Sequence, residues 1–217
     1  MAETSVTNAL LIGAVGGAIT AAIQYGVRRY GEMEQQRREI VETHLLQLQN
    51  SAESLYYRAR NLLEKHSRSA MSDDYYVKTS AFALGRVLAH EQQLMSKGVY
   101  AKLNRSTRMK REIKARLHAI NLTMDDREFL HYHRLRLAEM LLDKDGLISF
   151  GEFLKRWADP AYAGPVSSVS TFMRKLPTEG SAERLDKIRD AAGELVLLLE
   201  RETRVPSAMT LNVHLAK

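Results

Sequence analysis

The sequence predicts an all-α protein in which an N-terminal transmembrane helix is followed by a long helix and a five- or six-helix bundle. The chain has 217 residues with only four prolines, and it is rich in Leu, Ala, Arg, Glu and Lys, which are good helix formers. One N-terminal stretch of 22 residues carries no charge. Beyond that stretch, apolar residues recur at spacings of three, four or seven, which is the period of helices with one buried face.

The transmembrane helix is predicted at residues 6–27, VTNALLIGAVGGAITAAIQYGV. An α-helix needs about 20 mainly apolar residues to cross the hydrocarbon core of a bilayer. Only Glu3 carries a charged side chain before this run, and basic residues follow it: Arg28, Arg29, Arg37 and Arg38. The positive-inside rule then predicts a single-pass protein of the cell inner membrane, with its C-terminal domain in the cytoplasm.

Two other interpretations of this run stay open. It is rich in alanine and glycine and contains the polar residues Thr7, Asn8, Thr20 and Gln24, so it also suits a buried helix of a soluble core. A cleaved signal peptide is disfavoured, because no basic residue precedes the run and no clear cleavage site follows it. Within the run, Gly13 and Gly17 form a small-xxx-small pair, which is typical of membrane helices that pack closely against one another.

The anchor is expected at residues 1–29, the helical domain at 30–205 and a flexible C-terminal tail at 206–217. The helices of the domain are expected at residues 32–66, 74–97, 107–120, 124–142, 150–158, 165–176 and 181–204. No proline or glycine interrupts the first of them, and its apolar residues form one stripe that includes Ile40, Leu48 and Leu55. The second lies between Asp73, a candidate N-cap, and Gly98, a candidate C-terminal stop.

The remaining boundaries follow from helix-start and turn signals. Apolar spacings of three and four mark the helix 107–120, and Asp125 and Asp126 suit the positive start of the helix 124–142. A turn at residues 143–146 precedes the short helix that carries the single tryptophan, Trp157. Three further breaks delimit the last two helices: Asp159-Pro160, the segment 177–180 and Val205-Pro206.

Composition limits the chemistry of the chain. It has no cysteine, which excludes disulfides, a cysteine nucleophile and cysteine-ligated metals. Its net charge of +6 favours an anionic partner, and the predicted anchor makes lipid a better match than nucleic acid. No HExxH or comparable spacing occurs, so no metal, cofactor or catalytic set is predicted. The densest titratable group lies on one expected helix and consists of His131, Arg134, Arg136 and Glu139.

The sequence LLDKDGLISFGEF resembles part of an EF-hand calcium loop. Asp143, Asp145 and Glu152 fall at loop positions 3, 5 and 12, and Gly146 falls where the loop needs a sharp turn. Leu141 stands where the first carboxylate ligand belongs, which predicts weak calcium binding at most. The alternative is a connection between two helices in which Asp-x-Asp-Gly simply forms a good turn.

A basic stripe is expected on the helix 107–120. Arg108, Arg111 and Lys114 recur at every third position, and Glu112 is the only acidic residue among them. One interpretation is a solvated helix face, and the other is contact with anionic head groups. Nucleic acid is disfavoured, because Tyr100 is the only aromatic residue interleaved with the cations of this region.

Two blocks of the sequence resemble a known group of proteins. They are AFALGRVLAHEQQL at residues 81–94 and FLHYHRLRLAEMLLDKDGLISFGEFLKRW at residues 129–157. With the single N-terminal span and the long helix, they look like parts of uncharacterised, membrane-anchored helical proteins of actinobacteria and other bacteria. The resemblance implies an all-helical, membrane-anchored chain. That family has no assigned activity, so the resemblance assigns no functional residue.

The sequence therefore predicts a membrane-tethered helical interaction or anchoring module with no evident catalytic activity. Its expected partners are the lipid bilayer, an unidentified protein and, through the membrane helix, a second copy of the chain. One alternative is a membrane-bound effector or sensor whose helical domain controls self-association. Another is a degenerate EF-hand-like module that responds to calcium. A change of oligomeric state on a stimulus separates the sensor from a plain anchor.

Overall fold

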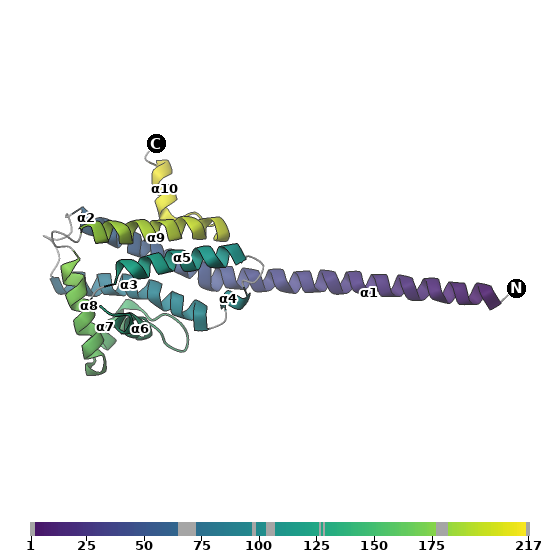
Figure 1. Ribbon diagram of the computed structural model, residues 1–217, viewed down its shortest axis with the longest axis horizontal. Helices are drawn as coiled ribbons and strands as arrows, with labels where there is room; N and C mark the ends of the chain where they lie inside the picture. The colour runs from purple at the N-terminus through teal and green to yellow at the C-terminus, as the bar shows by residue number, and fades with distance from the viewer. Residues whose placement is uncertain are drawn as a thin grey trace. The chain divides into compact units, whose positions relative to one another are not determined.

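The computed structural model describes residues 3–64, 73–96, 99–102, 107–125, 127, 129–176 and 182–215, and their side chains except at 3–19, 37, 73, 101, 102, 107 and 212–215. The regular structure of this part of the chain is helical and contains no β-sheet, so the predicted all-α class is confirmed (Figure 1). Its contacts divide the chain into two units, Met1–Glu39 and Ile40–Lys217. The predicted boundary between residues 29 and 30 lies inside the first unit.

The first unit consists of a single helix, α1 (Glu3–Ile40), which contains the whole predicted transmembrane segment. From Thr20 to Gly31 every residue is exposed. Over the side chains that the structure describes, no helix has both the length and the apolar character that a bilayer span requires. The side chains of residues 6–19, including the predicted packing pair at Gly13 and Gly17, lie outside that description. The transmembrane anchor therefore stays a prediction.

A π-helical turn, Val41–Leu45, separates α1 from α2 (Leu46–Leu63). This turn shifts the buried stripe by one residue, because its hydrogen bonds span five residues instead of four. Leu45 is therefore the next buried residue after Ile40, and His44 is half-buried. Met33 of the predicted stripe is exposed and Leu63 is half-buried, whereas five further residues are confirmed as buried: Leu48, Ala52, Leu55, Ala59 and Leu62.

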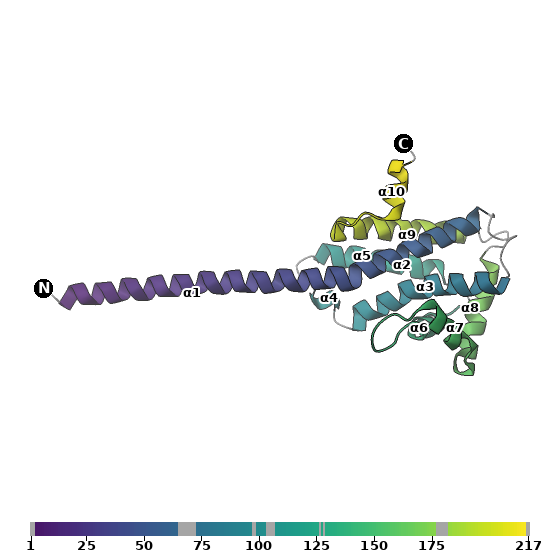
Figure 2. The same ribbon diagram turned by 180° about the vertical axis from the view of Figure 1, so that it is seen from behind.

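The centre of the second unit is formed by four long helices, seen from both sides in Figures 1 and 2. Helix α9 (Ala182–Thr203) packs between α2 and α5 (Thr107–Thr123), and α2 packs on its other side against α3 (Asp73–Ser96). A one-turn helix, α4 (Val99–Lys102), lies between α3 and α5 along the chain and buries Tyr100. The predicted bundle is thereby confirmed.

Three shorter helices cover the side of α3 that faces away from α2: α6 (His131–Met140), α7 (Phe150–Ala158) and α8 (Ala163–Lys175). A 3₁₀ turn, Pro160–Tyr162, leads into α8. Helices α3 and α6 approach closely at Gly85, where an added Cβ atom would lie 2.6 Å from Leu141 Cδ1 and 3.1 Å from Leu137 Cγ. The rings of Phe82 and Phe153, with centroids 5.3 Å apart, join α3 to α7.

The predicted helix 124–142 is wrong in its first third. Helix α5 ends in turns in which the Met124 and Asp125 N–H groups donate to carbonyls three residues earlier, each at 3.2 Å. Leu130 is extended, and α6 begins at His131. Met124 and Phe129 are fully buried, so the connection runs through the core. Burial of these two side chains outweighs the helix-start preference of Asp125.

The predicted flexible tail instead contains a helix, α10 (Ala208–Leu215). Helix α9 ends at Thr203, and the next residue, Arg204, has a φ of +60°, the left-handed conformation that often closes helices. Glu200 accepts hydrogen bonds from the Ser207 N–H and from Thr210 Oγ1, and Glu53 accepts one from the Met209 N–H. These contacts hold the start of α10 against α9 and α2, which no periodic pattern in the sequence indicates.

Candidate functional site

The uncharged run of α1 ends in a segment that carries exposed tyrosine and arginine side chains. Its large side chains are each more than half exposed: Ile23, Tyr25, Val27 and Tyr30. Arg28 Nε lies 3.0 Å from a carboxylate oxygen of Glu32, and the Arg29 guanidinium lies 6.0 Å from the ring centroid of Tyr25. Tyrosine is enriched where hydrocarbon meets water, and arginine is enriched on the cytoplasmic side. We call Tyr25–Tyr30 the tyrosine–arginine collar.

The loop between α6 and α7 is a closed turn. The Asp143 N–H donates to the Gly146 carbonyl at 2.9 Å, and Asp143 Oδ1 accepts from the Asp145 N–H at 2.8 Å. Gly146 has a φ of +134°, which favours glycine. Leu142 and Leu147 pair across the turn in an isolated antiparallel bridge. This is the geometry of the simple Asp-x-Asp-Gly turn.

The structure does not assemble the predicted calcium ligands. One carboxylate oxygen of Asp143 is used inside the turn, and Glu152 Oε2 lies 3.0 Å from Lys155 Nζ. Among the described residues, no group of three or more acidic or histidine side chains is placed to hold a metal ion. The geometry therefore gives no support to a calcium site at Asp143, Asp145 and Glu152.

The same turn is fixed from outside by an arginine of α7. Arg156 Nη1 donates to the Met140 carbonyl at 3.1 Å and to the Leu142 carbonyl at 2.7 Å. Met140 is the last residue of α6, so its carbonyl has no partner inside the helix, and Leu142 lies just beyond it at the start of the turn. A guanidinium therefore satisfies both carbonyls and ties α7 to the end of α6.

The predicted basic stripe is exposed on α5, but its members differ in their partners. Arg108 Nε donates to Glu112 at 2.7 Å, and Arg201 of α9 lies 3.7 Å from the other oxygen of that carboxylate. Arg111 and Lys114 have no carboxylate within ion-pair distance in the described part of the chain. Two of the three predicted cations therefore keep their charge uncompensated.

Two lysines of α5 lie over the ring of Tyr100. Lys114 Nζ lies 5.0 Å and Lys110 Nζ 6.0 Å from the centroid of the Tyr100 ring, a cation–π distance. Lys110, Arg111 and Lys114 occupy little more than one helical turn. We call these three residues the α5 cationic face.

A polar cluster that the sequence does not indicate lies where α3, α5 and α6 meet. Asn121 Nδ2 donates to Glu91 Oε2 at 2.7 Å, and Arg134 Nη1 donates to the Asn121 carbonyl at 3.1 Å. Burial raises the pKa of the Glu91 carboxyl, and the Asn121 hydrogen bond and the charges of His118, His131 and Arg134 act against that rise. The cluster joins three helices through one half-buried carboxylate.

The structure divides the predicted group on α6 into two parts. His131 and the buried Arg134 belong to the Glu91 cluster, whereas Arg136 Nη1 pairs with Glu139 at 2.6 Å on the outer surface. Arg134 also lies 3.8 Å from Asp125, and its Nε is buried without a hydrogen-bond partner among the described residues. The four predicted residues therefore do not converge on one site.

His90, the neighbour of Glu91, is almost fully buried, with 1% of its surface exposed. Burial, together with the nearby charges of Arg86 and His44, lowers the pKa of its imidazole to about 4, and a hydrogen bond with Gln93 opposes this change. His90 is therefore a neutral core residue at physiological pH.

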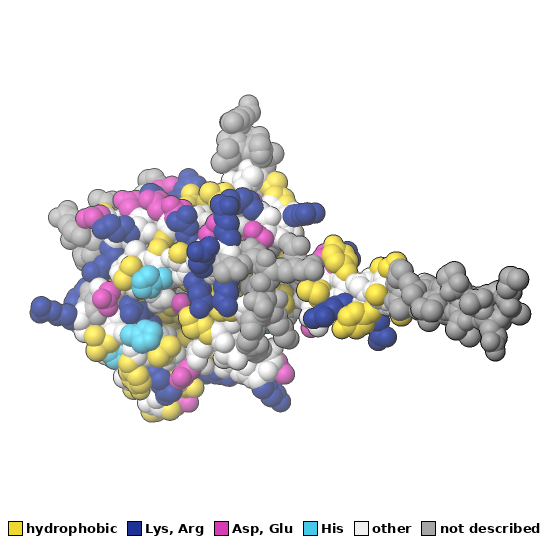
Figure 3. Space-filling model, turned by 45° about the vertical axis from the view of Figure 1, so that its right-hand side comes forward, with side chains coloured by type: hydrophobic (Ala, Val, Ile, Leu, Met, Phe, Trp, Pro, Cys, Tyr) yellow, Lys and Arg dark blue, Asp and Glu magenta, His cyan; other side chains and the backbone are white. Residues whose placement is uncertain are grey.

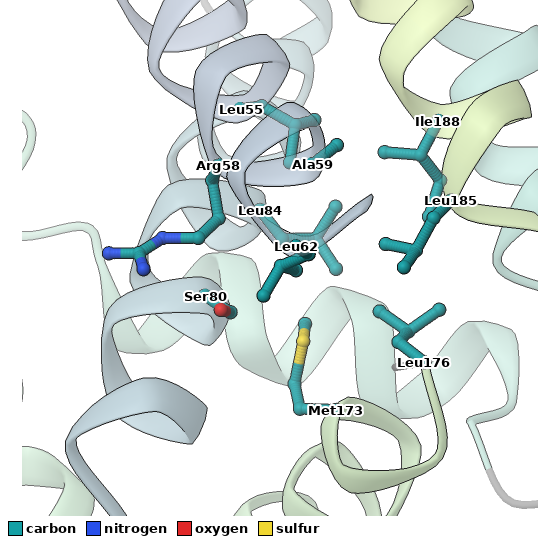
Figure 4. A pocket seen from close by; sticks show the side chains of 10 residues that line it. All are labelled: Leu55, Arg58, Ala59, Leu62, Ser80, Leu84, Met173, Leu176, Leu185 and Ile188. Atoms are coloured by element: carbon teal, nitrogen blue, oxygen red, sulfur yellow. The ribbon is translucent and has the colours of Figure 1, made fainter. Parts of the chain in front are cut away.

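A small cavity opens among α2, α3, α8 and α9 (Figure 4). Its empty space is about 280 Å³ including the open mouth. Aliphatic side chains such as Leu62, Leu176 and Leu185 point into it, whereas the Arg58 guanidinium points away. Ser80 Oγ is buried there without a hydrogen-bond partner among the described residues. The lining suits packing or a small apolar molecule and supplies no acid–base pair.

Comparison with models of protein families, with curated proteins and with solved structures found no match. The resemblance to membrane-anchored bacterial helical proteins therefore stays a prediction. Sequence reasoning missed Glu91, His118 and Asn121 because their neighbours come from three different helices. One weak signal existed, since Asn121 stands four residues after the buried Leu117 and so places a polar group at the edge of the apolar stripe.

Proposed function

We propose that the protein is a membrane-tethered helical module, anchored in the inner membrane by α1, whose cytoplasmic bundle engages a protein partner. The observation that carries this proposal is the form of α1. One unbroken helix contains the run of 22 uncharged residues, and the tyrosine–arginine collar lies at the C-terminal end of that run. A segment of about 20 residues is long enough to cross a bilayer, and exposed tyrosines beside arginines suit its cytoplasmic edge.

The alternative sensor function is favoured by one specific feature. Helical backbone continues from α1 through the π-helical turn Val41–Leu45 into α2, with no loop residue between them. Such π-helical turns often occur at functional positions. If Gly13 and Gly17 bring two copies together, this connection lets the bundle influence the association of the anchors. A stimulus that changes the oligomeric state of the full chain in detergent separates this function from simple tethering.

A charge in the middle of the anchor tests the proposal. Val15→Arg costs about 3 kcal/mol of insertion free energy at the centre of a membrane helix. We expect the wild-type chain to stay with the membrane fraction after an alkaline carbonate wash, and V15R to move into the supernatant. Gln35→Arg adds the same charge at an exposed position of α1 beyond the run and should stay with the membrane. Wild-type protein in the supernatant after lysis without detergent contradicts the anchor.

The orientation of the anchor can be tested because the chain has no cysteine. Ser5→Cys and Ser54→Cys place single thiols on either side of the proposed span, and Ser54 is exposed on α2. With a membrane-impermeant maleimide on spheroplasts, we expect S5C to be labelled at once and S54C only after lysis. The reverse order of labelling would show that the bundle lies outside the cytoplasm.

A further inference from the structure

The α5 cationic face is continued by an exposed histidine and an exposed leucine along the same side of α5. Lys114, His118 and Leu122 follow one another at intervals of four residues, so they share one side of the helix. All three are exposed, and 60% of the surface of Leu122 is open. This side of α5 is therefore cationic at Lys114 and apolar at Leu122, near the end of the helix.

The start of α6 extends this apolar part. The Arg134–Asn121 hydrogen bond holds α6 beside the end of α5. His118 of α5 and His131 of α6 both lie close enough to Glu91 for their charges to lower its pKa. Leu130, the residue before α6, is 51% exposed. Figure 3 shows lysine and arginine side chains gathered near histidines and hydrophobic side chains on one face of the bundle.

We propose that this face, made of Lys110, Arg111, Lys114, Leu122 and Leu130, docks on the surface of a bilayer that contains anionic phospholipid. Charge complementarity points to this occupant, because the cations have no carboxylate partner within the described residues. Basic residues bind anionic head groups, and neighbouring leucine side chains enter the boundary between head groups and acyl chains. Exposed leucines would gain nothing from a phosphate backbone, which favours lipid over a polynucleotide.

The proposal rests on the proposed membrane anchor. Tethering by α1 keeps the bundle at a high effective concentration near the bilayer, so a weak surface contact is sufficient for docking. Docking would then hold the bundle against the membrane where anionic lipid is abundant and release it elsewhere. High salt should weaken the contact, since exposed charges are screened.

The test uses the full chain reconstituted into vesicles. A fluorophore on Ala115→Cys reports on the exposed residue beside Lys114, and one on Ser54→Cys reports on α2. With a lipid-borne quencher, we expect quenching at position 115 to be stronger in vesicles of phosphatidylcholine with about one-third phosphatidylglycerol than in pure phosphatidylcholine. Quenching at position 54 should be the same in both.

Charge removal identifies the residues responsible. Arg111→Gln with Lys114→Gln should shift the ratio of docked to undocked bundle by about 25-fold, since each basic residue near an anionic surface contributes about fivefold. Lys144→Gln with Lys155→Gln removes the same charge from the exposed α6–α7 turn and from α7, and should leave quenching at position 115 unchanged. The proposal is overturned if the two double variants behave alike, or if lipid composition has no effect.

Two further results separate the possible failures. A chain that does not float with either kind of vesicle refutes the anchor, whereas a chain that floats but shows no lipid-dependent quenching refutes only the docking face. If duplex or single-stranded nucleic acid displaces the label from the vesicle and R111Q/K114Q abolishes that binding, the face binds polynucleotides and the lipid assignment is wrong.

Discussion

Replacing Phe129 by alanine should lower the free energy of unfolding by about 4 kcal/mol, because a fully buried phenylalanine leaves a large cavity. Phe129 has no exposed surface, and its ring stacks on Phe172 with centroids 4.7 Å apart. The stack joins the α5–α6 connection to α8. Urea unfolding of the full chain in detergent should show a lower midpoint with an unchanged slope.

Leu130→Ala is the matched control for this substitution. The neighbouring Leu130 is half exposed, so its truncation should change the free energy of unfolding by less than about 0.5 kcal/mol. Equal effects of F129A and L130A would mean that the connection between α5 and α6 does not cross the core. They would also remove the support that this connection gives to the Glu91 cluster.

Acidification should destabilise the bundle through His90. The folded-state pKa of this imidazole is about 4, below the ordinary value of 6.5, so the unfolded chain takes up the proton first as the pH falls. The stabilisation is complete above about pH 6.5 and is lost progressively as the pH falls towards about 4, with a total near 3 kcal/mol. The free energy of unfolding of His90→Gln should therefore decline less over this range than that of the wild type.

Glu91→Gln provides the control of opposite sign. Burial raises the pKa of Glu91, so the folded chain binds the proton more readily than the unfolded chain and gains stability on acidification. Without that gain, E91Q should lose stability more steeply with falling pH than the wild type. A profile of H90Q parallel to that of the wild type would show that His90 does not titrate as a buried group.

The helical periodicity of the sequence predicted most of the fold because the bundle is built from stripes that bury one face. The stripe from Leu48 to Leu62 packs between α3 and α9, and the turn signals around Phe150–Ala158 place α7 at its predicted bounds. The segment 124–130 was assigned wrongly because Asp125 is a good helix-start residue, whereas the burial of Phe129 depends on α8. Local preference cannot report a contact with a helix that follows much later in the chain.

The sites were harder to predict than the helices. The basic stripe was found correctly as a surface of α5, but the charge that stays uncompensated depends on Glu112, Arg201 and Tyr100, which only the fold brings near it. The EF-hand-like spacing was visible in sequence, yet the orientation of the Asp143 carboxylate into its own turn was not. Clusters such as that of Glu91 require three helices to be placed before any member is recognisable.

The bond from Arg156 to the end of α6 has a consequence for how this region opens. The Asp143–Gly146 turn lies on the surface, but its two flanking helices are joined by one guanidinium and by the Ile148 N–H, which donates to the Leu141 carbonyl at 3.0 Å. We therefore expect the hydrogen-bonded amides of Asp143 and Ile148 to exchange with solvent only when the two helix ends separate. The surface turn therefore joins α6 to α7, and we expect these two helices to unfold locally as one cooperative unit.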